Sequence, residues 1–334
     1  MALQIPSRRT FGARVALAAA GLAASAFPAL AQTYPSKVVS MIVPWPAGGP
    51  SDFVARQIQP DMQKSLGQTL IVENIGGVGG AIGVQKMLQS PADGYQVTLG
   101  SPLELIIAPI ALSTVKYKPE EARLVAQMVK APMVLIARKD LPAQNIDELM
   151  ALASKPGAKE LSFGNPGSGS MFHLAAEKMS QQTGLKFLHI PYKGSAPMMG
   201  DLMGGQVDLA LSIFAGPIPA MIADGKVKVL GLATRAPLAK FPQIPALAAH
   251  PKLTGFEFDS WAGLQVPRNT PDDVAAKLNK AANEAMQNPA VRKAFEDSGN
   301  LIVPPMSLAD LDRTYKAEIA RYQAIAKSIN FQPQ

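Results

Sequence analysis

The stretch Val43-Pro-Trp-Pro-Ala-Gly-Gly-Pro-Ser-Asp52 joins an apolar segment to a helical one through a proline- and glycine-rich turn. Residues 38–43 are apolar enough for a buried strand, which the prolines end. A strand that runs through a glycine loop into a helix start exposes backbone N–H groups and the positive end of a helix dipole, which together favour an anion. The same turn can also serve only to reverse the chain, so both interpretations stay open.

The residues after this turn predict a helix. Ser51 is a cap residue, Gly67 can end the helix, and Pro60 within it predicts a kink or a split into two helices. The apolar positions recur every four residues, at Val54, Ile58, Met62 and Leu66.

Strand-like and helix-like segments alternate along most of the chain. This alternation predicts an α/β fold with parallel sheets that carry helices on both faces, and ligands of such sheets bind at the carboxyl ends of the strands. Two later segments, 272–287 and 307–329, predict helices that cover a sheet. The predicted strands are 38–43, 70–73, 96–100, 134–137, 161–164, 187–191, 207–213 and 227–234.

Several predicted strands end in loops of small residues. Examples are Asn165-Pro-Gly-Ser-Gly-Ser170 and Pro191-Tyr-Lys-Gly194. Small residues let a backbone approach a bound group closely. Several such loops that converge would form a pocket.

The first 31 residues have the pattern of an export signal. Arg8, Arg9 and Arg14 precede an Ala/Leu/Val-rich run, and Ala31 ends a small-x-small cleavage pattern. The paired arginines fit a twin-arginine signal as well as an ordinary secretory one, and both alternatives stay open. No later segment reaches the roughly 18 apolar residues of a membrane span. We therefore expect a mature periplasmic protein, cleaved after Ala31.

Composition narrows the function further. The chain has 32 basic and 25 acidic residues without a basic run, which argues against nucleic-acid binding. It contains no cysteine, so it has no disulfide and no thiolate metal site. Its three histidines are scattered, at positions 173, 189 and 250, and do not show metal-ligand spacing. We expect no enzyme activity, no cofactor and no metal, and the length predicts two domains.

The order and spacing of several motifs resemble the Bug-type extracytoplasmic solute receptors, the substrate-binding subunits of tripartite tricarboxylate transporters. The similarity covers essentially the whole mature chain. The motifs are Pro44–Asp52, Leu66-Gly-Gln-Thr-Leu-Ile-Val-Glu-Asn74, Asp93-Gly-Tyr95, His189-Ile-Pro-Tyr-Lys-Gly194, Leu202-Met-Gly-Gly-Gln-Val-Asp208, Gly225-Lys-Val-Lys-Val-Leu230 and Ser260-Trp-Ala-Gly263.

The resemblance implies a two-lobed periplasmic-binding-protein fold of type II, with two parallel or mixed sheets flanked by helices. Residues 34–131 with 256–334 would form one lobe, and residues 132–255 the other. A small solute, usually a carboxylate, would bind in the cleft between the lobes. The resemblance also implies a monomer that works with the membrane subunits of a tripartite tricarboxylate transporter.

Matching positions place the ligand site on both lobes. Asp52 could instead favour the helix dipole, Lys193 could be a solvated turn residue, and Trp45 could plug the lobe rather than stack on the ligand. The predicted ligand-binding residues are Trp45, Ala47, Gly48, Gly49, Ser51, Asp52, Ser101, Glu104, Ser168, Gly169, Ser170, His173, Tyr192, Lys193, Gly194 and Ser212.

Two departures from the family pattern leave the ligand open. Glu104-Leu105 replaces a frequent Thr-His pair, and Leu211-Ser212-Ile213 replaces a frequent Phe-Asp-Asn. If Glu104 faces the cleft, it disfavours a polycarboxylate and favours an amide, amine or hydroxyl group. If it faces solvent, a mono- or dicarboxylate fits best. An aromatic solute, or a role as the ligand sensor of a membrane signalling partner, are further alternatives.

Overall fold

The computed structural model describes residues 34–155, 157, 159–166, 170–192, 194–328 and 333. The chain divides into two units, Met1–Ser36 and Lys37–Gln334. The predicted export signal lies outside the described residues, and the description below concerns the second unit. Among the described residues, no helix is long and apolar enough to cross a membrane.

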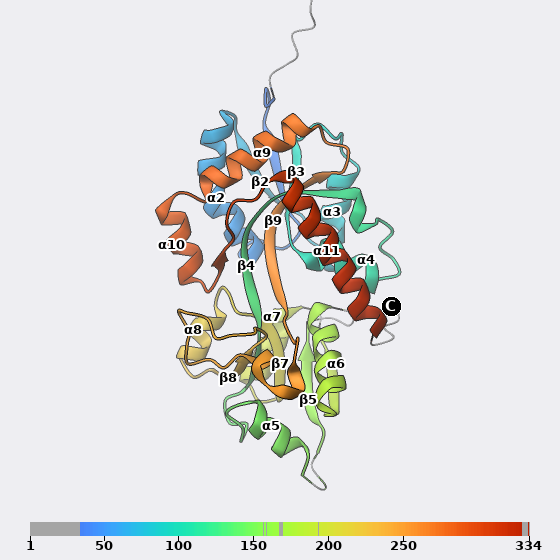
Figure 1. Ribbon diagram of the computed structural model, residues 1–334, viewed down its shortest axis with the longest axis vertical. Coiled ribbons are helices and arrows are strands. Elements are labelled where there is room, and N and C mark those ends of the chain that lie inside the picture. Colours follow the sequence, from blue (N-terminus) through green and yellow to red (C-terminus); the bar gives the residue numbers. More distant parts are fainter. Residues whose placement is uncertain are drawn as a thin grey trace, which may run out of the picture. The chain divides into compact units, whose positions relative to one another are not determined.

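The strands alternate with helices for most of the chain (Figure 1). Their bounds are β1 Val39–Val43, β2 Leu70–Asn74, β3 Gln96–Gly100, β4 Ala122–Arg138, β5 Leu161–Asn165, β6 Phe187–Pro191, β7 Leu209–Ile213, β8 Val227–Leu232, β9 Asp259–Pro267 and β10 Leu301–Ile302.

The helices include short 3-10 turns and one π-helical segment, η2. Their bounds are α2 Pro50–Leu66, η1 Val78–Gly80, α3 Ala81–Leu88, η2 Leu103–Ile107, α4 Ala108–Ala111, η3 Pro119–Glu121, α5 Ile146–Ala153, α6 Met171–Thr183, α7 Ser195–Met203, α8 Ile218–Ala223, η4 Leu247–Ala249, η5 Pro251–Leu253, α9 Asp272–Ala285, α10 Pro289–Asp297 and α11 Leu308–Ser328.

The strands are ordered β2-β1-β3-β9-β4-β7-β5-β6, with β8 and β10 also paired to β4. The first part of β4 pairs with β9 as far as Pro132, opposite Asp259. From Met133 onward the same strand pairs with β7 and β8. We call the group of β1, β2, β3, β9 and β10 the first sheet and the group of β5 to β8 the second sheet. The long strand β4 belongs to both (Figure 1).

Strand direction follows from these pairings. Both β3 and β4 are antiparallel to β9, and β1 is parallel to β3. Strands β1 and β3 therefore run in the same direction as β4, which leads from the first sheet into the second. In contrast, β7 is antiparallel to β4, and β5 and β6 run parallel to β7. The carboxyl ends of the parallel strands in the two sheets therefore point toward each other along β4.

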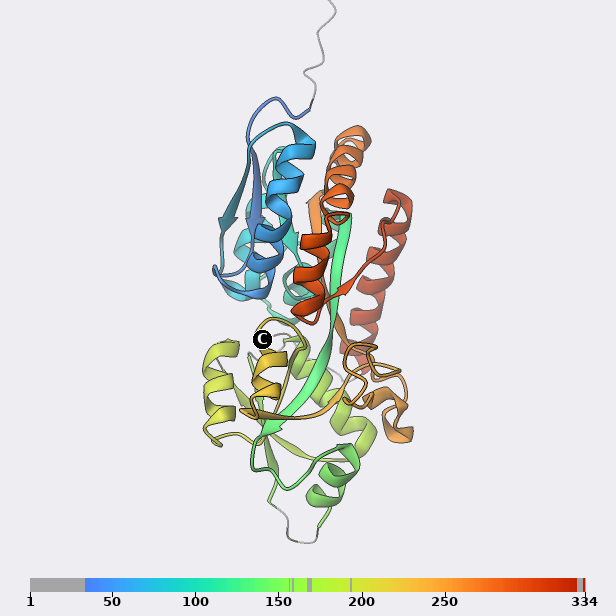
Figure 2. The ribbon, with the colours of Figure 1, turned by 90° about the vertical axis from the view of Figure 1, so that its left-hand side faces the viewer.

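Apolar packing covers both faces of the second sheet. In β4, Met133 and Leu135 belong to one buried cluster, and Val134 and Ile136 to another. This alternation is the period of two that a strand requires when both of its faces are buried. Helices α9 and α11 pack on β4, and α2 lies beside α9, as Figures 1 and 2 show.

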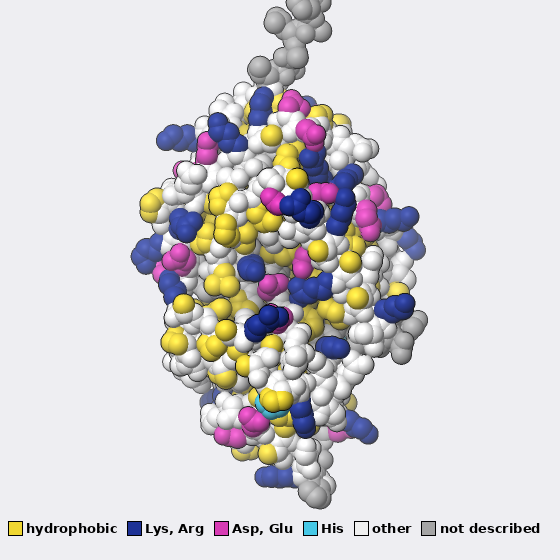
Figure 3. Space-filling view, viewed as in Figure 1, with side chains coloured by type: hydrophobic (Ala, Val, Ile, Leu, Met, Phe, Trp, Pro, Cys, Tyr) yellow, Lys and Arg dark blue, Asp and Glu magenta, His cyan; other side chains and the backbone are white. Residues whose placement is uncertain are grey.

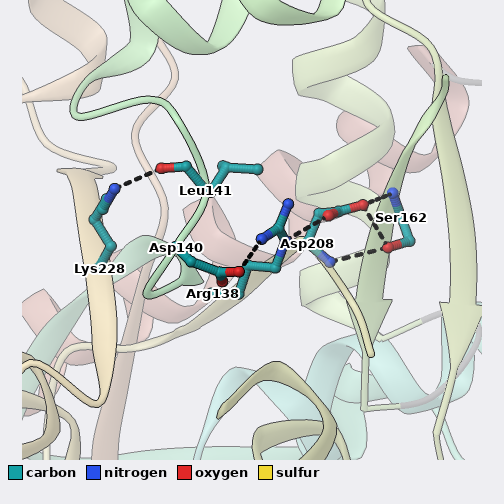
Figure 4. A network of polar contacts seen from close by, with 6 residues as sticks. All are labelled: Arg138, Asp140, Leu141, Ser162, Asp208 and Lys228. Atoms are coloured by element: carbon teal, nitrogen blue, oxygen red, sulfur yellow. Dashed lines mark hydrogen bonds and ion pairs between the residues drawn. The ribbon is translucent and has the colours of Figure 1, made fainter. Parts of the chain in front are cut away.

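A polar network fixes the far end of the second sheet (Figure 4). Asp208 accepts bonds from Arg138 Nε at 2.8 Å and from the Ser162 backbone N–H at 2.9 Å. Burial alone would raise the pKa of Asp208, but these bonds outweigh it and hold the pKa below its usual range. Lys228 Nζ donates to the Leu141 carbonyl at 2.5 Å. The network thereby ties together the ends of β4, β5, β7 and β8.

The sheets are mixed rather than purely parallel, because β4, β9 and β10 join them in antiparallel sense. The strand predicted at 134–137 is only the end of β4, and β9 and β10 were not predicted. The strands predicted at 207–213 and 227–234 are shorter, β7 and β8. Pro60 does not split the helix in two, since α2 is a single helix with Gly67 as its C-cap. Proline has no backbone N–H, so the Arg56 carbonyl lacks its helical hydrogen bond from Pro60. Both residues are exposed, so water can reach that carbonyl.

The close approach of β9 to β4 generates a stability prediction. A Cβ at Gly263 would lie 2.4 Å from the carbonyl oxygen of Ala126, so Gly263→Ala must push the two strands apart. We expect a loss of about 1–3 kcal/mol in the free energy of unfolding, measured by chemical denaturation. The exposed Gly200 in α7 has open space at its Cβ, so Gly200→Ala is the control and should be neutral or slightly stabilising. Equal stability of the two variants would contradict this account of the β4–β9 contact.

Candidate functional site

The loop after β1 exposes its backbone. Pro46, Ala47 and Gly48 are exposed, and Gly48 has a φ of +80°, a conformation that favours glycine. Helix α2 then begins with Gly49 as its N-cap, without a hydrogen bond from a capping side chain. The prediction that Ser51 caps this helix is wrong. Pro50 takes the first helical position, for which its fixed φ and missing N–H suit it, and Ser51 follows inside the helix.

Asp52 holds this loop from within the first turn of α2. Its carboxylate accepts from the Gly48 N–H at 2.8 Å, Arg56 Nε at 2.9 Å and Asn74 Nδ2 at 3.0 Å. Asn74 Nδ2 also donates to the Trp45 carbonyl at 3.1 Å. Burial acts to raise the pKa of Asp52, but the three donors outweigh it and lower the pKa. Asp52 is only 4 % exposed, so its main role in this structure is to shape the loop.

Glu104 joins the end of β3 to Trp45. Its carboxylate accepts from Trp45 Nε1 at 2.9 Å, from Ser101 Oγ at 2.8 Å and from the Ser101 backbone N–H. The side chain is fully buried, so neither sequence-based alternative, cleft-facing or solvent-facing, describes it. Burial raises the pKa of Glu104 to about 7, although the Ser101 and Trp45 bonds act to lower it. Trp45, half-buried, is thereby fixed through its indole N–H.

The predicted residues of the second sheet lie after β5, β6 and β7. Ser170 is the N-cap of α6, where its hydroxyl accepts the His173 N–H at 3.3 Å. Gly194 is the N-cap of α7, and Tyr192 Oη donates to Asp201 at 2.7 Å. Ser212 lies in β7, paired with Val134 of β4. Ser168, Gly169 and Lys193 lie outside the described residues.

The structure thus joins five of the eight predicted residues of the first sheet into one bonded group, which also includes Arg56 and Asn74. The five are Trp45, Gly48, Asp52, Ser101 and Glu104. Sequence reasoning missed two of its members, Arg56 and Asn74. Arg56 is one helical turn from Asp52, which is a readable signal, whereas Asn74 reaches Trp45 only because β2 pairs with β1.

Two of the histidines that are scattered in the sequence lie close together in the fold. His173 Nε2 lies 3.4 Å from Glu177 Oε1, and His189 Nε2 lies 3.1 Å from the same oxygen. Burial lowers the pKa of His189 most strongly, Glu177 opposes this effect, and the neighbouring His173 adds a smaller lowering effect. No sequence spacing indicates this contact, because β6 brings His189 beside α6 only in the folded chain.

Charged side chains of both signs share one face of the molecule. On the face shown in Figure 3, Lys and Arg side chains are scattered among Asp and Glu side chains.

Known proteins match this chain over most of its length. Residues 54–331 match the family model described as the tripartite tricarboxylate transporter family receptor. Protein BugT of Bordetella pertussis is 33 % identical over 320 residues, which are 93 % of this chain and 94 % of that protein. The structure of the periplasmic binding protein BugD is 32 % identical, with a TM-score of 0.79 over 90 % of this chain and 100 % of BugD.

Two further structures were described with small acids. A protein of R. palustris with adipate is 28 % identical and has a TM-score of 0.80, over 90 % of this chain and 100 % of that one. MatC from Rhodopseudomonas palustris with bound malate is 28 % identical and has a TM-score of 0.77, over 87 % of this chain and 99 % of MatC.

The fold is therefore that of a two-lobed periplasmic binding protein, as the sequence predicted. The chain belongs to the tripartite tricarboxylate transporter receptor family, and its homologues are solute-binding receptors.

The buried carboxyl group of Glu104 predicts a pH dependence. In the unfolded chain this group ionises near 4.5, whereas in the folded chain it ionises near 7. As pH rises through this window, the unfolded state loses the proton first, so folding should lose about 3 kcal/mol of stability to this group. We expect Trp45 fluorescence to titrate with a midpoint near pH 7.

Two variants separate this effect from other titrations. Glu104→Gln should remove both the fluorescence titration and this part of the pH dependence of unfolding. Trp45→Phe should remove the fluorescence titration but keep the pH dependence of unfolding, because Glu104 remains buried. An unchanged pH profile of Glu104→Gln would contradict the assignment.

Proposed function

We propose that this protein binds one small carboxylate solute between the two sets of strand ends and delivers it to the membrane subunits of a tripartite tricarboxylate transporter. The observation that carries the proposal is the opposed direction of the strands. The exposed Gly48–Gly49 turn and the side-chain-uncapped start of α2 follow β1, and the start of α7 follows β6. Carboxyl ends of strands in α/β sheets are where ligands bind.

Backbone N–H groups and a helix dipole are the chemistry proposed to hold the carboxylate. The 17-residue helix α2 directs its positive end at the exposed loop. On the second sheet we propose that Ser168, Gly169, Ser170, Tyr192, Lys193 and Gly194 contribute the opposite wall, with Ser212 beside them. The relatives with adipate and malate support a dicarboxylate rather than a tricarboxylate.

Glu104 has a positioning role in this proposal. Its carboxylate is bonded to Trp45 and Ser101, so it orients the indole and the end of β3 instead of contacting the solute. Because the raised pKa leaves a substantial neutral fraction of Glu104 near pH 7, its repulsion of a carboxylate solute is weakened.

Further parts of the proposal concern the state of the protein. We propose export by the first 31 residues with cleavage after Ala31, a monomeric receptor, and no catalysis. The family membership supports export to the periplasm, since a relative is a periplasmic binding protein.

A thermal-shift panel tests the ligand class. The mature protein is heated with adipate, malate, citrate, phthalate and hexanoate, and with adipamide as the uncharged counterpart of adipate. We expect a dicarboxylate to stabilise the fold by about 2.7 kcal/mol at 100 times its dissociation constant, and adipamide to have no effect. If adipamide alone shifts the melting temperature, the proposal of a carboxylate ligand is wrong and the ligand is an amide.

A pair of glycine variants tests the place of binding. Gly48→Val and Gly225→Val both put a β-branched residue at a positive φ, +80° and +65°, with open space around the Cβ. Each should cost about 1–3 kcal/mol of stability from backbone strain. Only Gly48→Val should lose affinity for the solute found in the panel, measured by calorimetry. Equal affinities of the two variants would contradict a site at this loop.

A further inference from the structure

We propose that His173, Glu177 and His189 form a binding site for one divalent transition-metal ion of the Zn²⁺ class on the second sheet. This site goes beyond the proposed solute binding and does not depend on it. Two imidazoles and one carboxylate are a ligand set that binds such ions and leaves one position open for water.

The fold supplies the three groups from two neighbouring elements. His173 and Glu177 lie one turn apart on α6 and so share a face of this helix. His189 comes from β6, at the edge of the sheet, and its ring centroid lies 5.1 Å from that of His173. One ligand atom from each residue can be chosen so that all three lie within 4.8 Å of one another.

The separations match those required by a metal ion. Zinc lies about 2.0–2.2 Å from imidazole nitrogen and carboxylate oxygen, so two ligands of a tetrahedral ion are about 3.3–3.5 Å apart. The distances from Glu177 Oε1 to the two Nε2 atoms are 3.4 Å and 3.1 Å. The ligand atoms of the two imidazoles lie within 4.8 Å of each other, so side-chain rotation completes the site for one ion.

Exposure allows an ion to enter while the site stays ordered. The side chains of His173 and His189 are 17 % and 21 % exposed, and that of Glu177 is 40 % exposed. Phe163 borders His189, with ring centroids 6.0 Å apart, and Phe187 packs on Phe163. The aromatic wall restricts the His189 ring, which lowers the entropy lost when the ion binds.

The hydrogen-bond partners of the metal-binding side chains determine the affinity that we expect for the ion. Histidine ligands usually donate their second ring N–H to a partner, and loss of such a partner weakens binding by about 10–100-fold. The buried Nδ1 of His189 has no hydrogen-bond partner among the described residues. We therefore expect a dissociation constant of about micromolar order rather than the far tighter binding of structural zinc sites.

Metal titration of the mature, untagged chain tests the proposal. After treatment with a chelator and its removal, Zn²⁺ is titrated by calorimetry, and Co²⁺ is titrated by its visible absorption. We expect one equivalent of each ion, with an absorption spectrum typical of nitrogen and oxygen ligands in a four- or five-coordinate site. Mg²⁺, which prefers oxygen ligands in octahedral geometry, should not compete.

Substitutions of the proposed ligands test where the ion binds. His189→Gln and Glu177→Gln should each weaken Zn²⁺ binding at least tenfold, and the half-exposed Glu177 can be replaced without disturbing the core. His250→Gln is the matched control, because His250 also pairs with a carboxylate, Asp147 at 3.0 Å, but lacks a second imidazole. It should bind Zn²⁺ as the unaltered protein does.

The results that would overturn the metal site differ from those that would overturn the proposed solute binding. The proposal is overturned if the chain binds no equivalent of Zn²⁺, if Co²⁺ gives only the octahedral spectrum of the aqueous ion, or if Glu177→Gln and His189→Gln bind as His250→Gln does. Circular dichroism of each variant confirms the fold. Because Glu177 and His189 are not part of the proposed solute site, a failure of the metal site leaves the proposed solute binding untouched.

Discussion

The structure depends on β4, a single 17-residue strand that pairs with β9 in one sheet and with β7 and β8 in the other. Each pairing fixes a strand direction, because the backbone hydrogen bonds of an antiparallel ladder form in one sense only. With β4 common to both sheets, the carboxyl ends of β1 and β3 must oppose those of β5 and β6. The opposed loops of the proposed solute site follow from this one constraint.

Buried polar groups then hold those loops in place. Asp52 binds the loop after β1 through the Gly48 N–H, and Glu104 binds the same loop through the Trp45 indole. Both carboxyl groups are buried, and each meets several donors, as a buried polar group must to avoid a large desolvation cost. Because the loop is already ordered, less conformational entropy is lost when a solute binds.

The alternation of strands and helices is visible in the sequence, and β3 and β6 were predicted at their observed bounds. Most of β4 was missed because Arg123, Gln127 and Lys130 interrupt the apolar pattern of residues 122–133, although most of these residues are buried. β9 was missed although Trp261 and Gly263 had been quoted as a motif. Its identity as a strand depends on the partner β4, which lies more than a hundred residues away in the chain.

The α/β class, the glycine turn before α2 and the family resemblance can be predicted from the amino-acid order alone, since each depends on short runs of neighbouring residues. The surroundings of Glu104 and the contact between two of the histidines are known only from the folded chain. The carboxylate of Glu104 meets Trp45 across 59 positions, and His189 meets Glu177 across the packing of a strand on a helix. Contacts between residues far apart in the sequence leave no periodic pattern in it, because the fold alone determines how close these residues lie in space.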